Sequence, residues 1–401
     1  MDIRSITCFV NIDAATHGAS AIAQAGEAAR QTRQALEAQG LTVQSARLAT
    51  QPLSLLPDPP LPLSSELWSR SSEAGFSYLS LGPVLADAPD ADLSRLDDLV
   101  ELVCTTETLF ATTLVARRDQ GIHLEAIRRT ASIIQDIAHS TDLGFGNLRM
   151  AVLANVDPLA PFFPAAYHDG GSPALSIATE SADLAVAAFS GARSVDEARK
   201  TLIAAVEAEG QRIAQAVQPV AQQLGFRFAG IDFSWAPFPE ELRSIGTAVE
   251  RLGVERFGAP GTLFVAALLT SCLRQARFPH CGFNGLMLPV LEDSLLAARS
   301  HERLFTVNDL LLYSSVCGTG LDTVPLPGDV GEEELAGILL DMATLALRLN
   351  KPLTARLMPI PGAQAGDLTE FDFSYFANGR VLDVKGLGSS GLFGREPWIA
   401  F

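Results

Sequence analysis

The spacing of apolar residues changes from a strand period to a helix period and back as the chain begins. Residues 4–11 alternate and carry β-branched side chains, which predicts a strand. Residues 21–39 are rich in alanine with Glu, Gln and Arg on the other face, and Gly40 follows, which is typical of a helix and its C-terminal stop. Residues 41–49 again favour a strand. The chain therefore opens as a βαβ unit, the unit of parallel sheets.

The same alternation continues to the end of the chain, without a linker-like shift in composition or a repeat of fixed period. We expect one α/β domain over residues 1–401, organised as a closed or nearly closed barrel. Further strands are expected at 76–84, 148–156, 226–232 and 353–358. Further helices are expected at 93–116, 123–140, 181–224, 261–275, 291–299 and 332–349. The proline-dense stretch 51–62 is the best candidate for a loop or lid.

Composition narrows the class of protein. Apolar residues make up 48% of 401 residues and charged residues only 19%, so we expect a large core. The formal charge of −17 argues against binding to nucleic acid or to anionic membranes. Five cysteines, none at C-x-x-C spacing, argue against a disulfide framework and fit a cytoplasmic location. The N-terminus lacks a signal-peptide pattern, and residues 262–273 are too short to cross a bilayer and are expected to form a buried helix.

Polar residues near strand ends are the candidates for chemistry, because function gathers there in parallel α/β folds. The first group is the stiff segment 161–168, which ends in Tyr167 and His168, with Arg149 before it and Glu180 after it. His168 is a candidate acid, base or orienting group. The alternative is a surface turn around a packed aromatic pair.

The second group is the segment 230–237. Asp232 and Ser234 point the same way if the chain is extended there, and they can bind a hydroxyl, an amine or one edge of a Mg²⁺ or Ca²⁺ site. The alternative is a turn in which both side chains satisfy their own backbone. In the third group, residues 283–293, Asn284 is a candidate ligand-binding residue, and the pair Glu292 and Asp293 is a weaker candidate for a cation or an amine. For at least one of these acids, we favour a role at a helix N-terminus.

The fourth group, residues 313–329, is the most unusual stretch of the chain. Cys317 lies in a loop with two glycines, where it can line a pocket or act as a nucleophile; a buried structural thiol is the alternative. Asp322 and Asp329 have apolar neighbours and are candidate ligand-binding residues. In the fifth group Arg356 can neutralise a carboxylate, whereas Lys351 suits a helix C-terminus. Zinc spacing, P-loop, Gly-x-Ser-x-Gly and kinase motifs are absent from the sequence, and a dinucleotide site has little support.

These segments together resemble the DUF711 (UPF0210) family. The blocks that carry the resemblance are FFPAAYH, DFSxAPxP, EDSxLA, YSxVCGxGLDxVP and KPLxARL, in this order along the chain. The resemblance implies a ten-stranded α/β barrel similar to that of pyruvate formate-lyase and ribonucleotide reductase. It carries no reaction with it. Relatives of this type are described beside small ACT-domain proteins, which implies such a protein as a partner and an amino-acid-like ligand.

The radical enzymes that share this barrel use a cysteine on a loop inside it, and Cys317 is the counterpart by position. The last residues, 386–401, contain glycines but no Arg-Val-x-Gly-Tyr motif, and the chain has no adjacent cysteine pair. We therefore do not expect a glycyl radical.

Two functions remain open. The first is an enzyme acting on a small polar metabolite with a carboxylate or an amine. Arg356 or Arg149 would anchor the anion, and Asp232, Asp322 and Glu180 would bind the polar end, directly or through Mg²⁺ or Ca²⁺. His168, Cys317 or Asp322 would perform the chemistry. The second is a non-catalytic sensor or scaffold that binds such a metabolite and a protein partner. A homodimer is expected from the prevalence of twofold symmetry.

Overall fold

The structure is a computed structural model that describes residues 1–57, 60–385, 388, 390–394 and 396–400. Over this part of the chain, eleven strands belong to one sheet. The strands are β1 (Asp2–Phe9), β2 (Val43–Ala49), β3 (Tyr78–Leu85), β4 (Leu109–Arg117), β5 (Gly121–His123), β6 (Met150–Ala154), β7 (Ala174–Glu180), β8 (Arg227–Asp232), β9 (Gly320–Pro327), β10 (Leu353–Ile360) and β11 (Trp398–Ile399).

Helices separate most of these strands. The described α-helices are α1 (Ala19–Ala38), α2 (Pro60–Glu73), α3 (Leu99–Thr105), α4 (Leu124–Ser140), α5 (Ala182–Ser190), α6 (Val195–Gln223), α7 (Ile245–Arg251), α8 (Thr262–Gln275), α9 (Ser294–His301), α10 (Val307–Ser314), α11 (Glu332–Leu349) and α12 (Ser390–Phe393). Short 3₁₀ segments are η1 (Leu53–Leu55), η2 (Ser94–Asp98), η3 (Asp142–Arg149) and η4 (Glu241–Arg243). The α/β class expected from the sequence is confirmed.

The main sheet has the order β8-β7-β1-β2-β3-β4-β6-β10-β9. β1, β2, β3, β4 and β6 are parallel to one another, whereas β7 pairs antiparallel with β1 and β10 pairs antiparallel with β6. The expected βαβ opening is present, with Ile3 of β1 opposite Val43 of β2. Two sets of strands thus run in opposite directions, and each contributes a different strand end to the same side of the molecule.

The strand path does not close on itself through a ladder of hydrogen bonds. Residues 279–290 carry isolated bridges to both end strands: Ile231 of β8 faces His280, and Asp322 of β9 faces Pro289. The closed ten-stranded barrel therefore stays a prediction.

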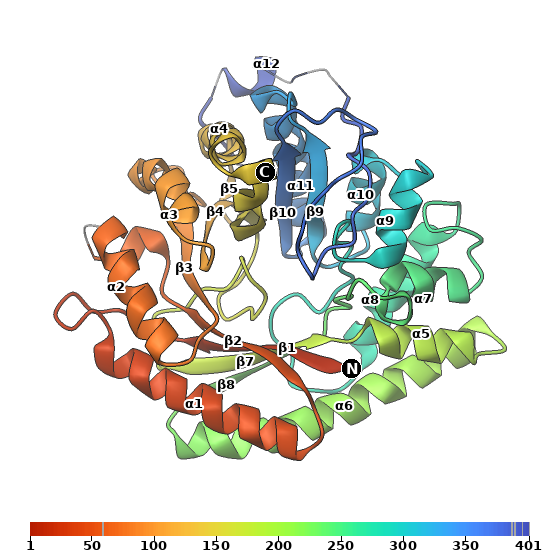
Figure 1. The fold of residues 1–401 in the computed structure, drawn as a ribbon, viewed down its shortest axis with the longest axis horizontal. Coiled ribbons are helices and arrows are strands. Elements are labelled where there is room, and N and C mark those ends of the chain that lie inside the picture. Colours follow the sequence, from red (N-terminus) through yellow and green to blue (C-terminus); the bar gives the residue numbers. More distant parts are fainter. Residues whose placement is uncertain (58–59, 386–387, 389, 395, 401) are drawn as a thin grey trace.

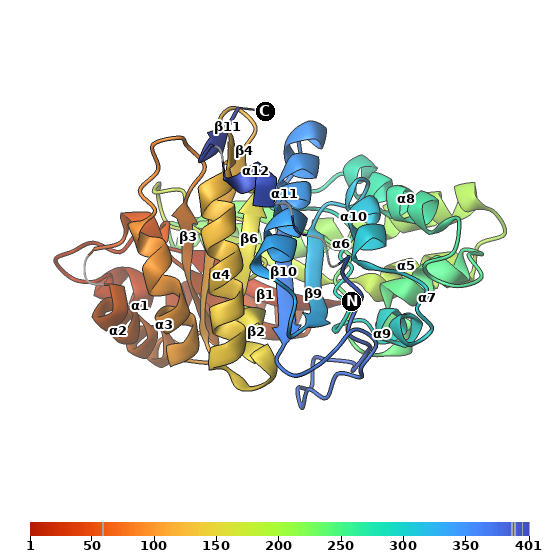
Figure 2. The ribbon, with the colours of Figure 1, turned by 90° about the horizontal axis from the view of Figure 1, so that it is seen from above.

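Helices cover the outer side of the sheet. In Figure 1, α1 and α6 lie along the side of β1, β2, β7 and β8 that faces away from the centre of the molecule. Figure 2 shows α4 and α11 in the same relation to β4, β6 and β10. The main core lies between the sheet and these helices. Eight of the nine residues of β4 are buried.

The prediction of a helix over residues 93–116 is wrong for the second half of this range. The chain forms η2 and α3 and then enters β4, because its apolar run lies in a sheet covered on both sides. Such strands lack alternation and look like buried helices in sequence. The expected loop 51–62 contains η1 and the start of α2, and residues 58 and 59 lie outside the described residues. Among the described helices, none is long and apolar enough to cross a membrane.

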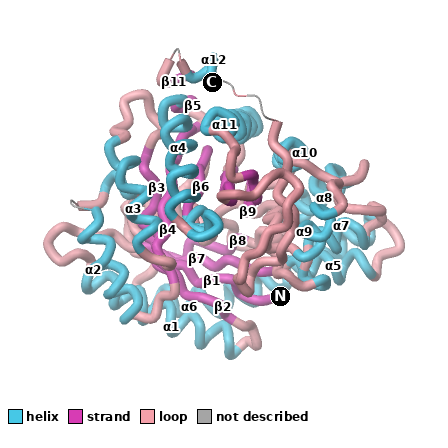
Figure 3. Tube along the Cα trace, turned by 45° about the horizontal axis from the view of Figure 1, so that its top comes forward, coloured by secondary structure: helices cyan, strands magenta, loops and turns pink. Residues whose placement is uncertain are grey.

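Two irregular segments fill the inner side of the sheet. Residues 156–167 contribute Val156, Phe162 and Tyr167 to an inner apolar cluster with Leu114 and Leu153. The chain after β10, residues 361–384, lies beside β9 and α9 and is drawn as loop in Figure 3. It is held there by the hydrogen bonds from Ala377 N to Leu291 O and from Leu382 N to Pro325 O. A cavity remains between these two segments.

Candidate functional site

The cavity has a volume of about 710 Å³ and is lined by the amino ends of β1, β2, β3, β4 and β6. The wall also includes residues of β9, β10, the 161–168 segment, residues 236–237, residues 287–292 and residues 371–375. The lining combines arginines, acids and aromatic rings: Arg4, Arg47, Arg149, Arg356, Glu107, Asp142, Glu292, Asp322, Asp372, Tyr78, Phe110, Phe145, Phe162, Phe163, Phe371, Phe373 and Tyr375.

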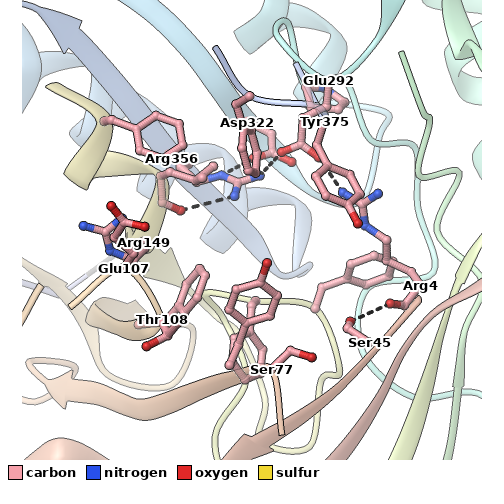
Figure 4. Close-up of a pocket in the computed structure, with 18 of the residues that line it drawn as sticks. Arg4, Ser45, Ser77, Glu107, Thr108, Arg149, Glu292, Asp322, Arg356 and Tyr375 are labelled. Carbon is pink, nitrogen blue, oxygen red and sulfur yellow. Dashed lines mark hydrogen bonds and ion pairs between the residues drawn. The ribbon is translucent and has the colours of Figure 1, made fainter. Parts of the chain in front are cut away.

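A row of alternating charges crosses one wall of this cavity (Figure 4). Arg4 donates to Glu292 Oε2 at 2.8 Å, and Arg356 donates to Glu292 Oε1 at 2.8 Å. Arg356 also donates through Nε to Asp322 Oδ1 at 2.7 Å. Glu292 therefore has both oxygens occupied, whereas Asp322 Oδ2 makes no hydrogen bond to any described residue.

The row continues into the protein through Glu180. Arg4 and Gln44 each donate to Glu180 Oε2 at 2.8 Å, and Arg243 pairs with the other oxygen. Glu180 is 2% exposed, and burial raises its pKa although Arg4 opposes the shift. Glu180 thus holds Arg4 in place from behind and does not line the cavity.

Asp322 is the acid of the row that lines the cavity and has a raised pKa. Burial raises the pKa of Asp322 above its usual 3.8, and Glu292 adds to the shift while Arg356 opposes it. The pKa of Arg356 is lowered by burial but raised more strongly by Asp322 and Glu292 together. A carboxylate with one free oxygen and a raised pKa can take up or release a proton in the cavity.

Arg47 stands apart from the charge row. Its guanidinium is partly accessible and lies over the rings of Tyr78 and Phe163, 5.6 and 5.3 Å from their centroids. Its Nε donates to Ser45 Oγ at 3.0 Å, and its two terminal nitrogens bond to no described residue. Burial and the neighbouring Arg4 lower the pKa of Arg47 to about 10. Among the described acids, none lies within ion-pair distance of it.

Arg149 also lacks an ion pair with a described acid, but its donors are used. Nε and Nη2 donate to the carbonyl of Val103, in the last turn of α3, at 3.4 and 3.0 Å. Burial lowers the pKa of Arg149, while Cys104 and Glu107 act in the opposite direction. Arg149 therefore supports the end of α3 and lines the cavity at the same time.

Four of the residues expected from the sequence line the cavity: Arg149, Glu292, Asp322 and Arg356. Their segments are far apart in the chain and meet only in the folded molecule. Of the three expected catalytic residues, Asp322 alone is among the lining residues.

His168 and Tyr167 are buried behind the cavity wall. The two ring nitrogens of His168 lie 2.8 Å from Asn11 Oδ1 and 3.2 Å from the Ser172 carbonyl, and burial lowers its pKa. Tyr167 donates to the Val156 carbonyl at 2.7 Å, and burial raises its pKa to about 12.

Asp232 organises the loop at 281–285. Its carboxylate accepts from Ser234 Oγ at 2.6 Å and from the backbone of Ser234, Phe283 and Asn284. The Asn284 side chain is bonded to Phe233 N and the Cys281 carbonyl. Burial raises the pKa of Asp232 despite these bonds. The bond from Ser234 N is the local turn contact, whereas the bonds from Phe283 and Asn284 join a distant segment. None of Asp232, Ser234 and Asn284 lines the cavity.

Cys317 is fully buried where α10 ends. The carbonyls of Cys317 and Ser314 both accept from the Lys351 ammonium, so Lys351 satisfies the end of α10. Asp329 lies exposed in the turn after β9. Asp293 is the N-cap of α9, which confirms a helix N-terminal role for one acid of the Glu292 and Asp293 pair.

In the described part of the chain, no group of three or more His, Cys, Asp or Glu side chains is arranged to hold a metal ion. The expected Mg²⁺ or Ca²⁺ site at Asp232, Glu292 and Asp293 stays a prediction.

Sequence reasoning missed Arg4, Arg47, Tyr78 and Tyr375. Arg4 and Tyr78 lie near the amino ends of β1 and β3, and Arg47 lies within β2, whereas the candidate segments follow strands. A signal was present in the sequence, because Arg4 and Arg47 place a positive charge inside segments that were expected to be strands or directly to continue them. Tyr375 lies in the irregular segment after β10, where no period marks it.

Comparison with known proteins agrees with the resemblance of the motifs. The family model described as "Uncharacterised ACR (DUF711)" matches residues 1–375. A UPF0210 protein of Pyrobaculum arsenaticum is 33% identical over 338 residues, covering 81% of this chain and 71% of the relative. UPF0210 proteins of Methanopyrus kandleri and Halothermothrix orenii are 29% and 26% identical and cover 96% and 98% of this chain, and 91% and 93% of their own length. The chain therefore belongs to the DUF711 family.

Proposed function

We propose that this protein is an enzyme that acts on a small carboxylate-bearing metabolite in the cavity, with Arg47 as the anchor of the carboxylate and Asp322 as the group that transfers a proton. The observation that carries the proposal is the state of Arg47. It is an arginine in a cavity wall whose terminal nitrogens have no partner among the described residues.

A guanidinium with two free terminal nitrogens matches a carboxylate in geometry and charge. Two parallel N–H···O bonds form between such groups, and they are stronger than bonds between neutral groups. The rings of Tyr78 and Phe163 fix the plane of Arg47, so little side-chain freedom is lost when an anion binds. Burial and Arg4 lower the pKa of Arg47, and a bound anion would offset this lowering.

Asp322 supports the catalytic half of the proposal. Asp322 lines the same cavity with one oxygen, Oδ2, free of described partners, and Arg356 holds its other oxygen in a fixed position. With a raised pKa it can accept a proton from a bound metabolite and return it.

A non-catalytic metabolite sensor is the second candidate. It is favoured by one observation: His168 and Cys317 are both buried outside the cavity lining, and the ring nitrogens of His168 already face partners. Binding without any product in the presence of intact Asp322 would support this candidate.

For the architecture, we propose that residues 279–290 close the sheet into a barrel by taking the place of a tenth strand. Support comes from backbone bonds on both sides, from Ile231 N to Pro279 O at 2.7 Å and from Val290 N to Asp322 O at 3.2 Å. This arrangement would be the barrel of pyruvate formate-lyase without its glycyl radical. The five cysteines are all free, which supports our proposal of a reducing, cytoplasmic setting. The homodimer and a small ACT-domain partner stay predictions.

The test compares two arginines of the same cavity, Arg47→Met and Arg149→Met. Thermal unfolding is followed in sodium acetate and in sodium chloride of equal ionic strength. We expect acetate to stabilise the unchanged protein and Arg149→Met in a saturable way, and to have no such effect on Arg47→Met. Without acetate, Arg47→Met should be no less stable than the unchanged protein, because an arginine without an ionic partner is removed. Arg149→Met should lose about 1–3 kcal/mol, because the Val103 carbonyl loses its donors.

Equal stabilisation of Arg47→Met by acetate would refute Arg47 as the anchor. A large loss of stability in Arg47→Met without acetate would show that its role is structural.

A further inference from the structure

More aromatic rings lie around Arg47 than are needed to hold its side chain in place. Tyr78 and Phe110 meet edge to face at 5.5 Å between centroids, and Phe110 and Phe163 at 5.2 Å. All three rings line the cavity, together with Phe162. An anion held by Arg47 would therefore extend along ring faces and edges.

A second aromatic group lines the cavity from the segment after β10. Phe373 lies 5.2 Å from Phe145 and 5.4 Å from Tyr375, centroid to centroid. Tyr375 in turn lies 5.2 Å from the guanidinium carbon of Arg4. The cavity thus has two aromatic groups, each beside an arginine.

The charge of the lining limits the anion to a single negative charge. Four arginines and five acids line the cavity, namely Arg4, Arg47, Arg149 and Arg356 against Glu107, Asp142, Glu292, Asp322 and Asp372, so four minus five gives a net charge of −1. Arg4 and Arg356 are already paired with these acids or with Glu180, and Arg149 with a carbonyl. A phosphate dianion would find one free arginine and several repelling carboxylates.

The volume points to a body larger than the carboxylate itself. About 710 Å³ is within the range of roughly 300–1,000 Å³ in which proteins enclose drug-sized ligands. A molecule the size of acetate would leave both aromatic groups in contact with water.

Resting on the proposed function, we infer that the ligand is an aryl monocarboxylate, with its carboxylate on Arg47 and its ring against Tyr78, Phe110 and Phe163. This assigns the cavity a substrate class, an aromatic ring joined to one carboxylate. The aromatic group around Phe373 borders the space into which a ring substituent would extend.

Titration calorimetry tests this inference with four probes: acetate, 3-phenylpropionate, 3-cyclohexylpropionate and phenyl phosphate. We expect 3-phenylpropionate to bind about tenfold or more tightly than acetate, because a ring leaves water. It should also bind about threefold or more tightly than 3-cyclohexylpropionate, because only an aromatic ring interacts edge to face with the wall. Phenyl phosphate should bind more weakly than 3-phenylpropionate.

Two variants locate the ring. Phe163→Leu should abolish the preference for the aromatic ring and keep acetate binding. Phe373→Leu, a change in a half-buried side chain, should keep both the preference and acetate binding if the ring lies against Phe163.

The outcomes separate the inference from the function on which it rests. Carboxylates that bind through Arg47 with no preference for the aromatic ring, or a preference for phenyl phosphate, would overturn the aryl monocarboxylate and leave the proposed function standing. A preference lost in Phe373→Leu but kept in Phe163→Leu would overturn the assignment of the ring to the Phe163 wall. If none of the probes binds in a way that depends on Arg47, the proposed function fails, and the inference with it.

Discussion

Asp322 is subject to opposing influences at the cavity wall. Burial and Glu292 favour its protonated form, and Arg356 favours its charged form; the net result is a raised pKa. A ligand carboxylate in the same cavity adds a further negative charge, which is repelled by ionised Asp322. Anion binding and protonation of Asp322 should therefore favour each other.

We expect Asp322→Asn to bind 3-phenylpropionate about three- to tenfold more tightly at neutral pH, since one repelling charge is gone and Arg356 keeps only Glu292 as a described acidic partner. In the unchanged protein the affinity should rise as the pH falls from neutral toward the raised pKa of Asp322, because the protonated acid no longer repels the ligand. This dependence should flatten in Asp322→Asn. Calorimetry over this range measures both effects, with Asp372→Asn, at an exposed lining residue, as the control. Weaker binding in Asp322→Asn alone would mean that Asp322 donates to the ligand.

At the scale of the elements, Asp293 joins two helices that are separate in sequence. Its carboxylate caps α9 through Leu295 N and Leu296 N, both at 3.0 Å. It also accepts from Ile245 N at the start of α7 and from Ser244 Oγ, both at 2.6 Å. A fully buried acid thus satisfies the first turns of α7 and α9 together.

Asp293→Ala should lower the free energy of unfolding by about 3 kcal/mol or more, because buried donors at two helix ends lose their acceptor. The control is Ser194→Ala, which removes the exposed cap of α6 alone and should lower it by about 1 kcal/mol. Urea unfolding followed by circular dichroism measures both values. Equal losses in the two variants would show that Asp293 is no more than an ordinary cap.

At the scale of the whole molecule, the segment 279–290 and the residues before β9 approach each other backbone to backbone. A Cβ built on Gly318 would lie 2.7 Å from Gly285 Cα, and one built on Gly285 would lie 2.2 Å from Gly318 Cα. Gly285 belongs to the segment that bridges β8 and β9, and Gly318 precedes β9. Both positions are glycine because nothing larger fits between the two backbones.

Gly318→Ala should therefore lower the free energy of unfolding by about 2–4 kcal/mol, since the segment 279–290 must move away from β9. The matched control is Gly191→Ala, at an exposed helix end where the nearest atom to a new Cβ is 3.9 Å away. Both values come from the same urea titration. A Gly318→Ala variant as stable as Gly191→Ala would contradict the close contact between these two backbones.

The spacing of hydrophobic residues, together with the residues that mark element boundaries, determined much of the secondary structure. The helix expected at 332–349 is observed as α11 with the same ends, and the opening βαβ unit lies within two residues of its expected position. These elements carry their own signals: a clean amphipathic face, an alternating strand, and glycine at a boundary. The motif segments also pointed to Arg149, Glu292, Asp322 and Arg356, because polar residues in apolar surroundings need a partner or a ligand.

Only the tertiary structure decided which of these residues belong to one site. His168, Asp232 and Cys317 have the same kind of sequence surroundings as Asp322, but the fold places them outside the cavity lining. The rest of the fold already uses or encloses these three groups. The Asp232 carboxylate accepts from Phe283 N and Asn284 N. The ring nitrogens of His168 face Asn11 and the Ser172 carbonyl, and Cys317 is fully buried. Arg47 has no acidic partner among the described residues because of where β2 lies relative to the other charged elements, and no local pattern in the sequence contains that information.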